Sequence, residues 1–427
     1  MYKIRLIASA LFLLAAVLTF SGLAVQLSPL FEFQAAPLFM RCAASGSAGA
    51  CIMLGILLLL TLLTGRFYCS FLCPFGLLQD VFIFLSRRRS KGQKNFFLLR
   101  YLLLGIVAGL FFCGLNWGFL LLDPYSTAGR ILSAFTVGGM TALILIALLA
   151  VWKQRIFCTA LCPVGTFLGF LSCFSPRKLT ISEACVLCGK CVKVCPSGCI
   201  DLSSRTLDNE RCIRCMACVS GCPKKCIGFS ASASIPGRRQ FLISAGSFLT
   251  GLAAGILLAR SGLIRLGEKM KILPPGAGNA GRFAQKCTAC MLCAANCPSK
   301  IIVPARGGTG PVELDYSKGF CNHNCRRCSE VCPTGAIRPL SLSEKRKLKI
   351  AEAKFDPRNC IVFQAEEACG QCAGVCPTGA ITLRKNGTPR PVKSQLCTGC
   401  GACQNICPAV PKAMKISPIE QQTGLEK

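Results

Sequence analysis

Cysteine is the most informative residue type in this chain, because its copies recur at fixed short intervals. Four runs share the spacing Cys-x2-Cys-x2-Cys-x3-Cys-Pro. They are Cys185, Cys188, Cys191 and Cys195; Cys212, Cys215, Cys218 and Cys222; Cys287, Cys290, Cys293 and Cys297; and Cys397, Cys400, Cys403 and Cys407. Soft thiolates hold iron, and this spacing lets one loop surround three corners of a cubane. Each run therefore predicts a [4Fe–4S] cluster.

Two further runs keep the Cys-Pro ending but lengthen the first gap. They are Cys321, Cys325, Cys328 and Cys332, and Cys360, Cys369, Cys372 and Cys376. Both continue as Cys-Pro-Thr-Gly-Ala-Ile, so the turn after the last ligand is retained. A zinc ribbon also takes four cysteines per site, but it has no Cys-Pro ending. We therefore predict six [4Fe–4S] clusters in all.

Neighbouring runs are expected to exchange their last cysteine, as in bacterial two-cluster ferredoxins. We expect Cys222 to complete the cluster of Cys185, Cys188 and Cys191, and Cys195 to complete that of Cys212, Cys215 and Cys218. For the four later runs two arrangements stay open. Short connections favour first with second and third with fourth. Resemblance to four-cluster ferredoxin subunits of respiratory enzymes favours first with fourth and second with third.

A different cysteine pattern occurs twice. Residues 66–76 read RFYCSFLCPFG, and residues 155–165 read RIFCTALCPVG. Within each copy the cysteines are one helical turn apart, and the proline redirects the chain. Together Cys69, Cys73, Cys158 and Cys162 could form a redox site linked to quinol, acting as thiols or as four ligands of one metal centre. The alternative is a folding signature in which the cysteines only pack. We favour the first, because both pairs recur together with the arginine.

The other cysteines are interpreted as small packing side chains. They are Cys42, Cys51, Cys113, Cys173, Cys199 and Cys226. A secreted disulfide scaffold is excluded, since such scaffolds are short and scatter their cysteines. The one histidine, His323, lies within the second of the later runs and is expected to hydrogen-bond locally. Without a membrane histidine pair or a Cys-x2-Cys-His sequence, we predict no haem.

The elements that position these cysteines include five apolar stretches, each long enough to cross a ~30 Å hydrocarbon layer as a helix. They are Leu6–Leu27, Ala43–Thr64, Leu102–Leu122, Ile131–Trp152 and Phe241–Ala259, and none contains Lys, Arg, Asp or Glu. The hydrophobic content of 52% and the mean hydropathy of +0.52 exceed those of ordinary soluble proteins. A membrane protein in contact with lipid is expected.

Basic residues predict the orientation. Lys3 and Arg5 precede the first span, and the loop after the second span contains Arg66, Arg87, Arg88, Arg89, Lys91 and Lys94. The positive-inside rule places both in the cytoplasm, with Ser28–Cys42 and Asp123–Arg130 outside and Arg177–Ser234 inside. These flanks explain part of the net charge of +31, and anionic clusters would explain more, so we predict no nucleic-acid partner.

Paired arginines, Arg238 and Arg239, stand before the last apolar stretch. The arrangement resembles a twin-arginine export signal, although Gly237 and Ile243 depart from the usual pattern. The alternative is an ordinary fifth span with the arginines as inside anchors, and both interpretations place residues from Arg265 onward outside.

The expected fold is a multi-domain membrane protein with four parts. Residues 1–175 form a four-helix transmembrane region with the two Cys-x3-Cys-Pro motifs, and residues 176–234 form a cytoplasmic ferredoxin-like domain with two clusters. Residues 235–262 form a signal or anchor helix, the fifth transmembrane helix, and residues 263–427 form a periplasmic α+β ferredoxin domain with four clusters.

These features carry a resemblance to two families. Residues 1–234, with four spans, two Cys-x3-Cys-Pro motifs and a two-cluster domain, resemble the NapH-type membrane subunit of periplasmic nitrate reductase systems. From Gly237 onward the chain resembles the exported NapG/MauM-type ferredoxin, so the whole resembles a natural fusion of the two. The resemblance implies a quinol dehydrogenase-type electron-transfer component in the bacterial inner membrane. It would take electrons from the quinol pool and pass them to a periplasmic cytochrome, reductase or dehydrogenase.

Three acidic residues near span ends are candidate proton acceptors beside a quinol, because an ionisable group near the bilayer is costly. They are Glu32 and Asp123 on the outer side and Asp80 on the inner side. Interfacial solvation is the alternative, and Asp123 before Pro124 also fits a turn start. Two other functions stay open: an assembly factor that reduces a metal or metalloenzyme with the Cys-x3-Cys-Pro thiols, and reverse flow that reduces quinone.

Overall fold

The computed structural model describes residues 2–86, 96–116, 121–133, 137–231, 237–261, 271–305, 310–364, 369–385 and 387–425. The chain divides into two compact units, Met1–Leu266 and Gly267–Lys427, and each is treated by itself. The basic residues from Arg87 to Lys94, on which the predicted orientation partly rests, lie outside the described residues, as does Arg265.

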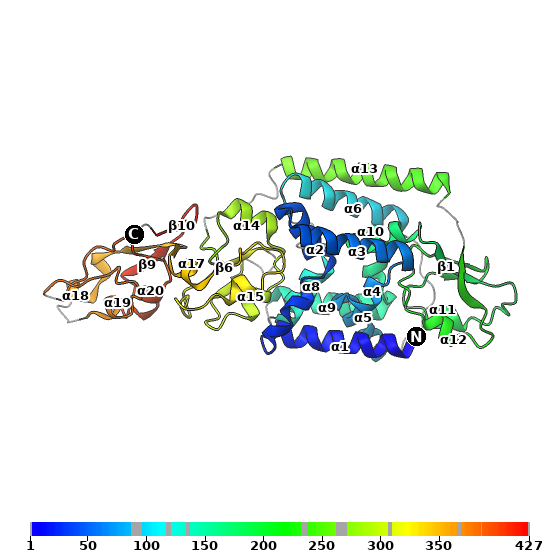
Figure 1. Ribbon diagram of the computed structural model, residues 1–427, viewed down its shortest axis with the longest axis horizontal. Helices are drawn as coiled ribbons and strands as arrows, with labels where there is room; N and C mark the ends of the chain where they lie inside the picture. The colour runs from blue at the N-terminus through cyan, green and yellow to red at the C-terminus, as the bar shows by residue number, and fades with distance from the viewer. Residues whose placement is uncertain are drawn as a thin grey trace. The chain divides into compact units, whose positions relative to one another are not determined.

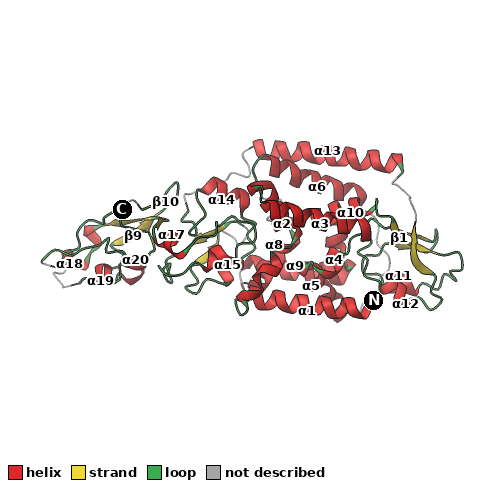
Figure 2. Cartoon of the chain, viewed as in Figure 1, coloured by secondary structure: helices red, strands yellow, loops and turns green. Residues whose placement is uncertain are grey.

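The first unit is dominated by a helical bundle (Figures 1 and 2). Its helices are α1 (Tyr2–Phe20), α2 (Ala35–Ser45), α3 (Ala48–Thr64), α4 (Tyr68–Phe71), α5 (Pro74–Ser86), α6 (Phe97–Phe112), α8 (Pro124–Ser133), α9 (Val137–Lys153), α10 (Pro163–Ser172) and α13 (Arg238–Arg260), with a 3₁₀ turn η1 (Val25–Phe31) and a π-helical turn η2 (Phe157–Leu161). Large apolar side chains such as Ile52, Leu59 and Leu148 are more than half exposed on these helices. An apolar outer surface of this kind suits contact with lipid better than contact with water.

Except for α13, which extends beyond Phe241–Ala259 at both ends, the helices are shorter than the predicted spans. Among the described residues, α1 and α13 are long and apolar enough to cross a membrane, and α8 with α9 would add a third span if the bent pair is counted as one. The predicted span Ala43–Thr64 is interrupted because Gly46 adopts a left-handed conformation that ends α2 before α3 begins. Moreover, each Cys-Pro is followed by a further apolar helix, α5 or α10, which the sequence did not predict.

Helix α13 packs against α6 with backbone in direct contact. A Cβ at Gly251 would lie 2.2 Å from the carbonyl oxygen of Leu102, and a Cβ at Gly105 would lie 2.2 Å from that of Phe248. Gly109 and Gly255 face each other in the same interface. Small residues four apart on both helices permit this approach, which is a common way of joining membrane helices; the two helices run side by side in Figure 1.

The same unit contains a small α+β domain. Strand β1 (Arg177–Ile181) pairs antiparallel with β4 (Ile227–Ala231), and β2 (Ile200–Asp201) pairs with β3 (Thr206–Leu207). The short helices α11 (Lys190–Val194) and α12 (Ala217–Gly221) complete it. Its buried core consists of cysteines with Leu179, Ile200 and Ile227. Few apolar side chains are therefore available to stabilise the domain, and the group that the cysteines bind must contribute to its stability.

The second unit is also built of short elements. Its helices are α14 (Ala280–Lys286), α15 (Leu292–Ala295), α16 (Arg327–Glu330), α17 (Leu342–Arg346), α18 (Ile361–Gln364), α19 (Gln371–Gly374) and α20 (Ala402–Ile406), with a 3₁₀ turn η5 (Pro357–Asn359). Its strands form three antiparallel pairs: β5 (Ile302–Pro304) with β6 (Val312–Leu314), β7 (Leu348–Lys349) with β10 (Thr423–Gly424), and β8 (Glu352–Phe355) with β9 (Met414–Ser417). Most of the remaining chain forms the cysteine loops.

Candidate redox centres

Each regular cysteine run is curled by two residues with positive φ, one on either side of its second cysteine. These residues are Leu187 and Gly189, Arg214 and Met216, Ala289 and Met291, and Gly399 and Gly401. The left-handed conformation costs a non-glycine residue about 1 kcal/mol or more and persists only where the surroundings require it. The same turn at four places, strained in the three that use non-glycine residues, fits a loop shaped around one kind of guest, as a cubane cluster would require.

The lining of each of four cavities includes three cysteines from one run and one from the neighbouring run, and Cys199 also lines the first cavity. The groups are Cys195, Cys212, Cys215 and Cys218; Cys287, Cys290, Cys293 and Cys332; Cys360, Cys369, Cys372 and Cys407; and Cys376, Cys397, Cys400 and Cys403. In these cavities cysteines of the first later run lie with one of the second, and cysteines of the third and fourth lie together, which favours the pairing by short connections.

The other cysteines of the runs gather in the same manner. Cys328 interacts electrostatically with Cys321, Cys325 and Cys297 of the preceding run. In the first unit, Cys191 interacts with Cys185 and Cys188, and Cys226 lies beside both Cys185 and Cys222. His323 is half-buried between Cys321 and Cys325.

Burial sets the acidity of several of these thiols. It raises the pKa of Cys287 to about 11 and that of Cys403 to about 12. Without a cation such thiols stay protonated at neutral pH, so iron would have to displace their protons. Cys199, expected only to pack, is buried but also contacts the sulfur of Cys195 at 3.6 Å, and this contact lowers the pKa of Cys195 to about 6.

The two Cys-x3-Cys-Pro motifs meet inside the bundle. Cys69, Cys73, Cys158 and Cys162 belong to one buried cluster, so the structure brings all four predicted thiols together. Each motif begins at a helix end, passes through a short turn, and continues as α5 or α10 from its proline. Proline is favourable at this first helical position, where no backbone N–H is needed.

Reciprocal hydrogen bonds join the copies. Arg66 donates from Nη2 to the carbonyl oxygen of Cys158 at 2.8 Å, and Arg155 donates from Nη1 to the carbonyl oxygen of Cys69, also at 2.8 Å. Both arginines have no exposed surface. The glycine that ends each motif leaves room for this contact: a Cβ at Gly165 would lie 2.6 Å from Nη2 of Arg66, and one at Gly76 would lie 3.1 Å from Nη1 of Arg155.

Donors approach all four sulfurs, and that of Cys73 accepts from the backbone N–H of Gly76. The backbone N–H of Gly165 donates to Sγ of Cys162 at 3.2 Å, and Nε2 of Gln79 lies 3.6 Å from Sγ of Cys158. Arg66 Nη2 lies 3.8 Å from Sγ of Cys69. These contacts direct partially positive N–H hydrogen atoms towards the sulfurs, and this stabilises negative charge on the sulfurs.

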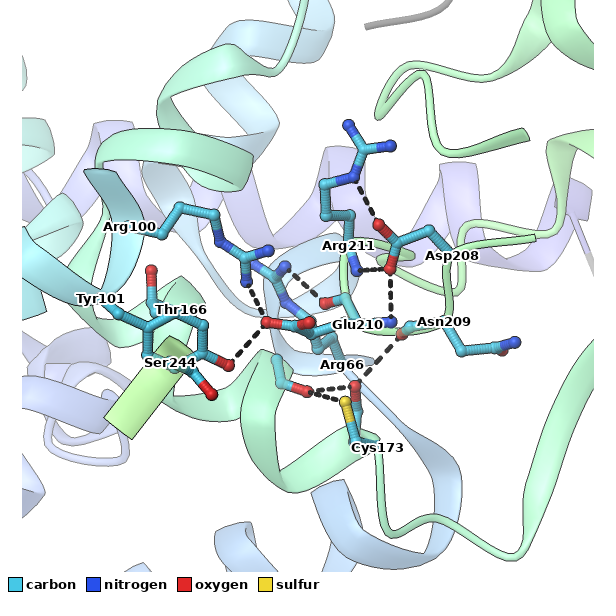
Figure 3. Close-up of polar contacts among 12 residues, drawn as sticks. Arg66, Arg100, Tyr101, Thr166, Cys173, Asp208, Asn209, Glu210, Arg211 and Ser244 are labelled. Carbon is cyan, nitrogen blue, oxygen red and sulfur yellow. Dashed lines mark hydrogen bonds and ion pairs between the residues drawn. The ribbon is translucent and has the colours of Figure 1, made fainter. Parts of the chain in front are cut away.

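The small α+β domain of strands β1 to β4 is attached to the bundle beside the four Cys-x3-Cys-Pro cysteines. Arg100 forms an ion pair with Glu210 at 3.0 Å, and the Tyr101 hydroxyl donates to the same carboxylate at 2.8 Å. Arg66 also donates to the carbonyl oxygen of Glu210, as Figure 3 shows. Glu210 stands two residues before Cys212, and Cys215 belongs to the same buried cluster as the four bundle cysteines.

The three predicted proton acceptors have different surroundings. Asp80 is held by both Arg5 and Arg155, and Glu32 is paired with Arg41. Asp123 is fully buried and caps α8, since its Oδ2 accepts from the backbone and side chain of Ser126. Its Oδ1 has no hydrogen-bond partner among the residues that the structure describes.

The loop Ser28–Cys42, predicted on the outer side of the membrane, lies beside the first Cys-x3-Cys-Pro motif, predicted on the cytoplasmic side. The Tyr68 hydroxyl donates to Oε1 of Gln34 at 2.7 Å, and Nε2 of Gln34 donates to the carbonyl oxygen of Leu72. Sequence reasoning placed both motifs at the cytoplasmic face because a span ends before each. In the structure the following helices and Gln34 enclose them, so the four cysteines lie within the bundle.

Three cysteines expected to pack differ from that prediction. Cys42 and Cys51 form a disulfide, which joins α2 to α3 and which the sequence did not reveal because the two residues stand in apolar surroundings. Cys113 is exposed at the end of α6, whereas Cys173 is half-buried and Cys226 is buried. The twin arginines Arg238 and Arg239 begin α13 and are exposed.

Comparison with known families identifies cluster-binding domains along the chain. A family model described as a 4Fe-4S binding domain matches residues 48–92 and again 134–182, one match for each Cys-x3-Cys-Pro motif. Models described as 4Fe-4S dicluster domains match residues 177–223, 320–380 and 367–410, and a further 4Fe-4S binding domain matches residues 284–306.

Curated relatives agree with these matches. The ferredoxin-type protein NapG of Escherichia coli (strain K12) is 30% identical over 205 residues, which cover 44% of this chain and 88% of NapG. The chain belongs to the family of NapG ferredoxin-type proteins. Within this ferredoxin-type group it is also 31% identical to NapF of the same organism, over 32% of this chain and 80% of NapF. YccM, named for electron transport, is 31% identical over 50% of this chain and 64% of YccM. No solved structure matches the chain.

Proposed function

We propose that this protein is a membrane-bound electron carrier that takes electrons from the quinol pool and delivers them through [4Fe–4S] clusters to a periplasmic oxidoreductase. The observation that carries the proposal is the contact between two redox-capable cysteine groups. Four thiols lie inside an apolar bundle, and Cys215 of the adjoining cluster-binding domain packs into the same buried cluster. This arrangement offers a continuous route between the bundle and a cluster domain.

The six cysteine groups would hold the clusters, each taking three sulfurs from one run and one from its neighbour. The strained loops and the cysteine-lined cavities fit this guest. Clusters of this kind supply one-electron steps and need no proton or bond change at the cysteines. The protein's part is to hold the sulfurs and to exclude water from them.

The membrane setting is supported by three features. The bundle exposes large apolar side chains, and α1 and α13 are of spanning length. Disulfides persist in oxidising compartments, so Cys42–Cys51 is suited to the periplasmic side. In this arrangement the chain is a fusion of a NapH-type membrane part with an exported NapG/MauM-type part, and α13 joins them.

Quinol oxidation releases two electrons and two protons, so the site needs a proton acceptor as well as a redox centre. Of the three acidic candidates, Asp123 alone is fully buried with one carboxylate oxygen unpartnered within the described residues. It interacts electrostatically with Tyr68, the residue before Cys69. We therefore assign one of the two protons to Asp123, with the other released to water, whereas Asp80 is committed to two arginines.

The alternative of an assembly factor requires the Cys-x3-Cys-Pro thiols to meet a metal or metalloenzyme. All four thiols are at most 5% exposed. A soluble partner could not reach them without opening the bundle, so the electron-carrier function fits the burial better.

Anaerobic addition of a reduced quinol analogue to the purified chain tests the proposal, with cluster reduction followed by electron paramagnetic resonance. We expect reduction in the parent and none in a variant with Cys69, Cys73, Cys158 and Cys162 changed to Ser, while dithionite still reduces the remaining clusters in both. If quinol reduces neither protein although dithionite reduces both, direct quinol oxidation by this chain is wrong.

A further inference from the structure

We propose that Arg214 is the counter-charge of the cluster held by Cys195, Cys212, Cys215 and Cys218, and that its guanidinium group raises the reduction potential of that cluster. The inference rests on the proposed function, in which this cluster receives electrons from the bundle. Its test uses chemical reductants and no quinol.

Arg214 occupies a place in its cysteine run where no charge is required. It lies between Cys212 and Cys215, in the left-handed conformation that curls each regular run. At the same place the other regular runs have uncharged residues, which are Leu187, Ala289 and Gly399. The shape of the loop therefore does not explain why an arginine stands here.

The guanidinium group of Arg214 is buried without a carboxylate partner. The residue is only 2% exposed. Its Nη2 donates to the carbonyl oxygen of Arg177 at 2.7 Å, but its Nε and Nη1 have no hydrogen-bond partner within the described residues. The ring of Phe229 lies 5.6 Å from the guanidinium carbon, and it carries no net charge. By contrast, the buried Arg100 is paired with the carboxylate of Glu210.

The bundle covers the guanidinium group from another side. A Cβ at Gly65 would lie 2.5 Å from Nε of Arg214, so the backbone just before the first Cys-x3-Cys-Pro motif packs directly on this side chain. The two unpaired nitrogens are inaccessible to solvent. A buried charge that neither water nor a carboxylate compensates is costly, so the site calls for an anion.

The cluster bound by the same loop is the anion within reach. Arg214 interacts electrostatically with Cys212 and Cys199, and Cys212 lines the cavity together with the three other predicted ligands. A cluster with four thiolate ligands carries about two negative charges when oxidised and about three when reduced. Because the guanidinium group stays protonated at neutral pH, it attracts the reduced form more strongly and makes reduction easier.

The position of this cluster gives the higher potential a role. Cys215 belongs to the same buried group as the four Cys-x3-Cys-Pro cysteines, whereas no cysteine of the run from Cys185 to Cys195 is among the described members of that group. The cluster beside Arg214 therefore adjoins the bundle and is the favoured first acceptor. The one electron that it gains is the one that the bundle donor loses, and no proton or bond is transferred.

A redox titration of the anaerobically purified full chain tests the inference, with dithionite as reductant, redox mediators and detection by electron paramagnetic resonance. Arg214→Gln removes the charge, whereas Arg214→Lys keeps it. In Arg214→Gln the midpoint potential of one cluster should shift to a more negative value, and the other clusters should keep the parent potentials. In Arg214→Lys all potentials should stay close to those of the parent. Cys218→Ser identifies the shifted signal, because it changes a ligand of that cluster.

Arg205→Gln is the matched control. Arg205 lies in the same small domain and also has a positive φ, but it is exposed, and water screens an exposed charge. All its cluster potentials should equal those of the parent. An unshifted potential in fully loaded Arg214→Gln overturns the inference. Equal shifts in Arg214→Gln and Arg214→Lys also overturn it, because the charge would then not set the potential.

Iron and acid-labile sulfide analysis decides the case in which a variant loses the cluster. Loss of about four iron atoms from Arg214→Gln but not from Arg214→Lys supports the counter-charge, since the cluster then needs the charge to bind. Loss from both variants contradicts it, because the loop would then need the arginine whatever its charge. Quinol enters none of these measurements, so this inference and the proposed function can fail separately.

Discussion

Arg155 donates a hydrogen bond from Nη1 to the carbonyl oxygen of Cys69 at 2.8 Å, although 86 residues separate them in the chain. Arg66 makes the equivalent bond to Cys158. Each motif copy thus supplies the arginine for the other, which explains why the arginine, the first cysteine and the glycine recur together. The copies differ in their second partner: Arg155 pairs with Asp80, whereas Arg66 turns to the cluster-binding domain at Glu210.

The glycine that ends each motif should not tolerate a side chain. In Gly165→Ala the new Cβ would lie 2.6 Å from both Arg66 Nη2 and the carbonyl oxygen of Cys158. Overpacking of this kind costs about 1–3 kcal/mol, so the unfolding temperature in detergent should fall. Gly55→Ala in α3 is the matched control, because nothing lies within 4 Å of its Cβ position. Equal stability of the two variants would contradict the interlock.

The Glu210 carboxylate should hold the cluster-binding domain to the bundle. Glu210→Gln leaves the buried guanidinium of Arg100 without its anion, and removal of one partner from a buried ion pair costs about 3–5 kcal/mol. We expect faster limited proteolysis between α10 and β1. Asp201→Asn serves as control, since that carboxylate only caps the exposed turn at Ser203 and Ser204. If the Glu210→Gln variant is cleaved as slowly as the parent, the Glu210 carboxylate does not hold the domain to the bundle.

Helix α13 should remain in the mature protein. A cleaved export signal needs no tight partner, whereas Gly251 and Gly255 bring α13 into backbone contact with α6. Mass spectrometry of protein from membranes should therefore find one chain that contains peptides from both sides of α13. Two fragments divided near α13 would show that the helix acts as a cleaved signal.

The same packing can be tested by substitution. Gly255→Leu should destabilise the bundle by about 1–3 kcal/mol through overpacking, because its Cβ position lies 2.4 Å from the carbonyl oxygen of Ile106. Gly246→Leu, on the same helix with nothing within 4 Å of the Cβ position, should leave the stability unchanged. The comparison uses thermal unfolding of both variants in one detergent.

Cysteine pairing in the second unit predicts which variants lose the same cluster. Cys287 and Cys332 line one cavity, so Cys287→Ala, Cys332→Ala and the double variant should each lose about four iron atoms. Cys287→Ala with Cys407→Ala should lose about eight, because Cys407 lines a different cavity. Pairing of the first later run with the fourth would give the reverse result, in which the second double variant loses only one cluster.

Local sequence was sufficient for the cysteine runs. The spacing of Cys287, Cys290 and Cys293 determines that a short loop can surround one guest, since all three lie within seven residues of one another. The repeat of Arg66–Gly76 at Arg155–Gly165 was likewise visible, and the same family model matches both copies. Apolar runs indicated helices, but they could not show that Gly46 would divide one of them.

Partners distant in sequence were decided only by the tertiary structure. Nothing local assigns Cys332 to the first later run, joins Cys42 to Cys51, or turns Arg66 towards Cys158. The pairing of charges, too, depends on the fold, since Asp80 and Glu210 became partners of buried arginines through packing. Spacing specifies what a segment can bind, whereas burial and close packing determine which other segment it contacts. The sequence by itself therefore determined the chemistry of the sulfurs. The tertiary structure decided how the sulfurs are grouped.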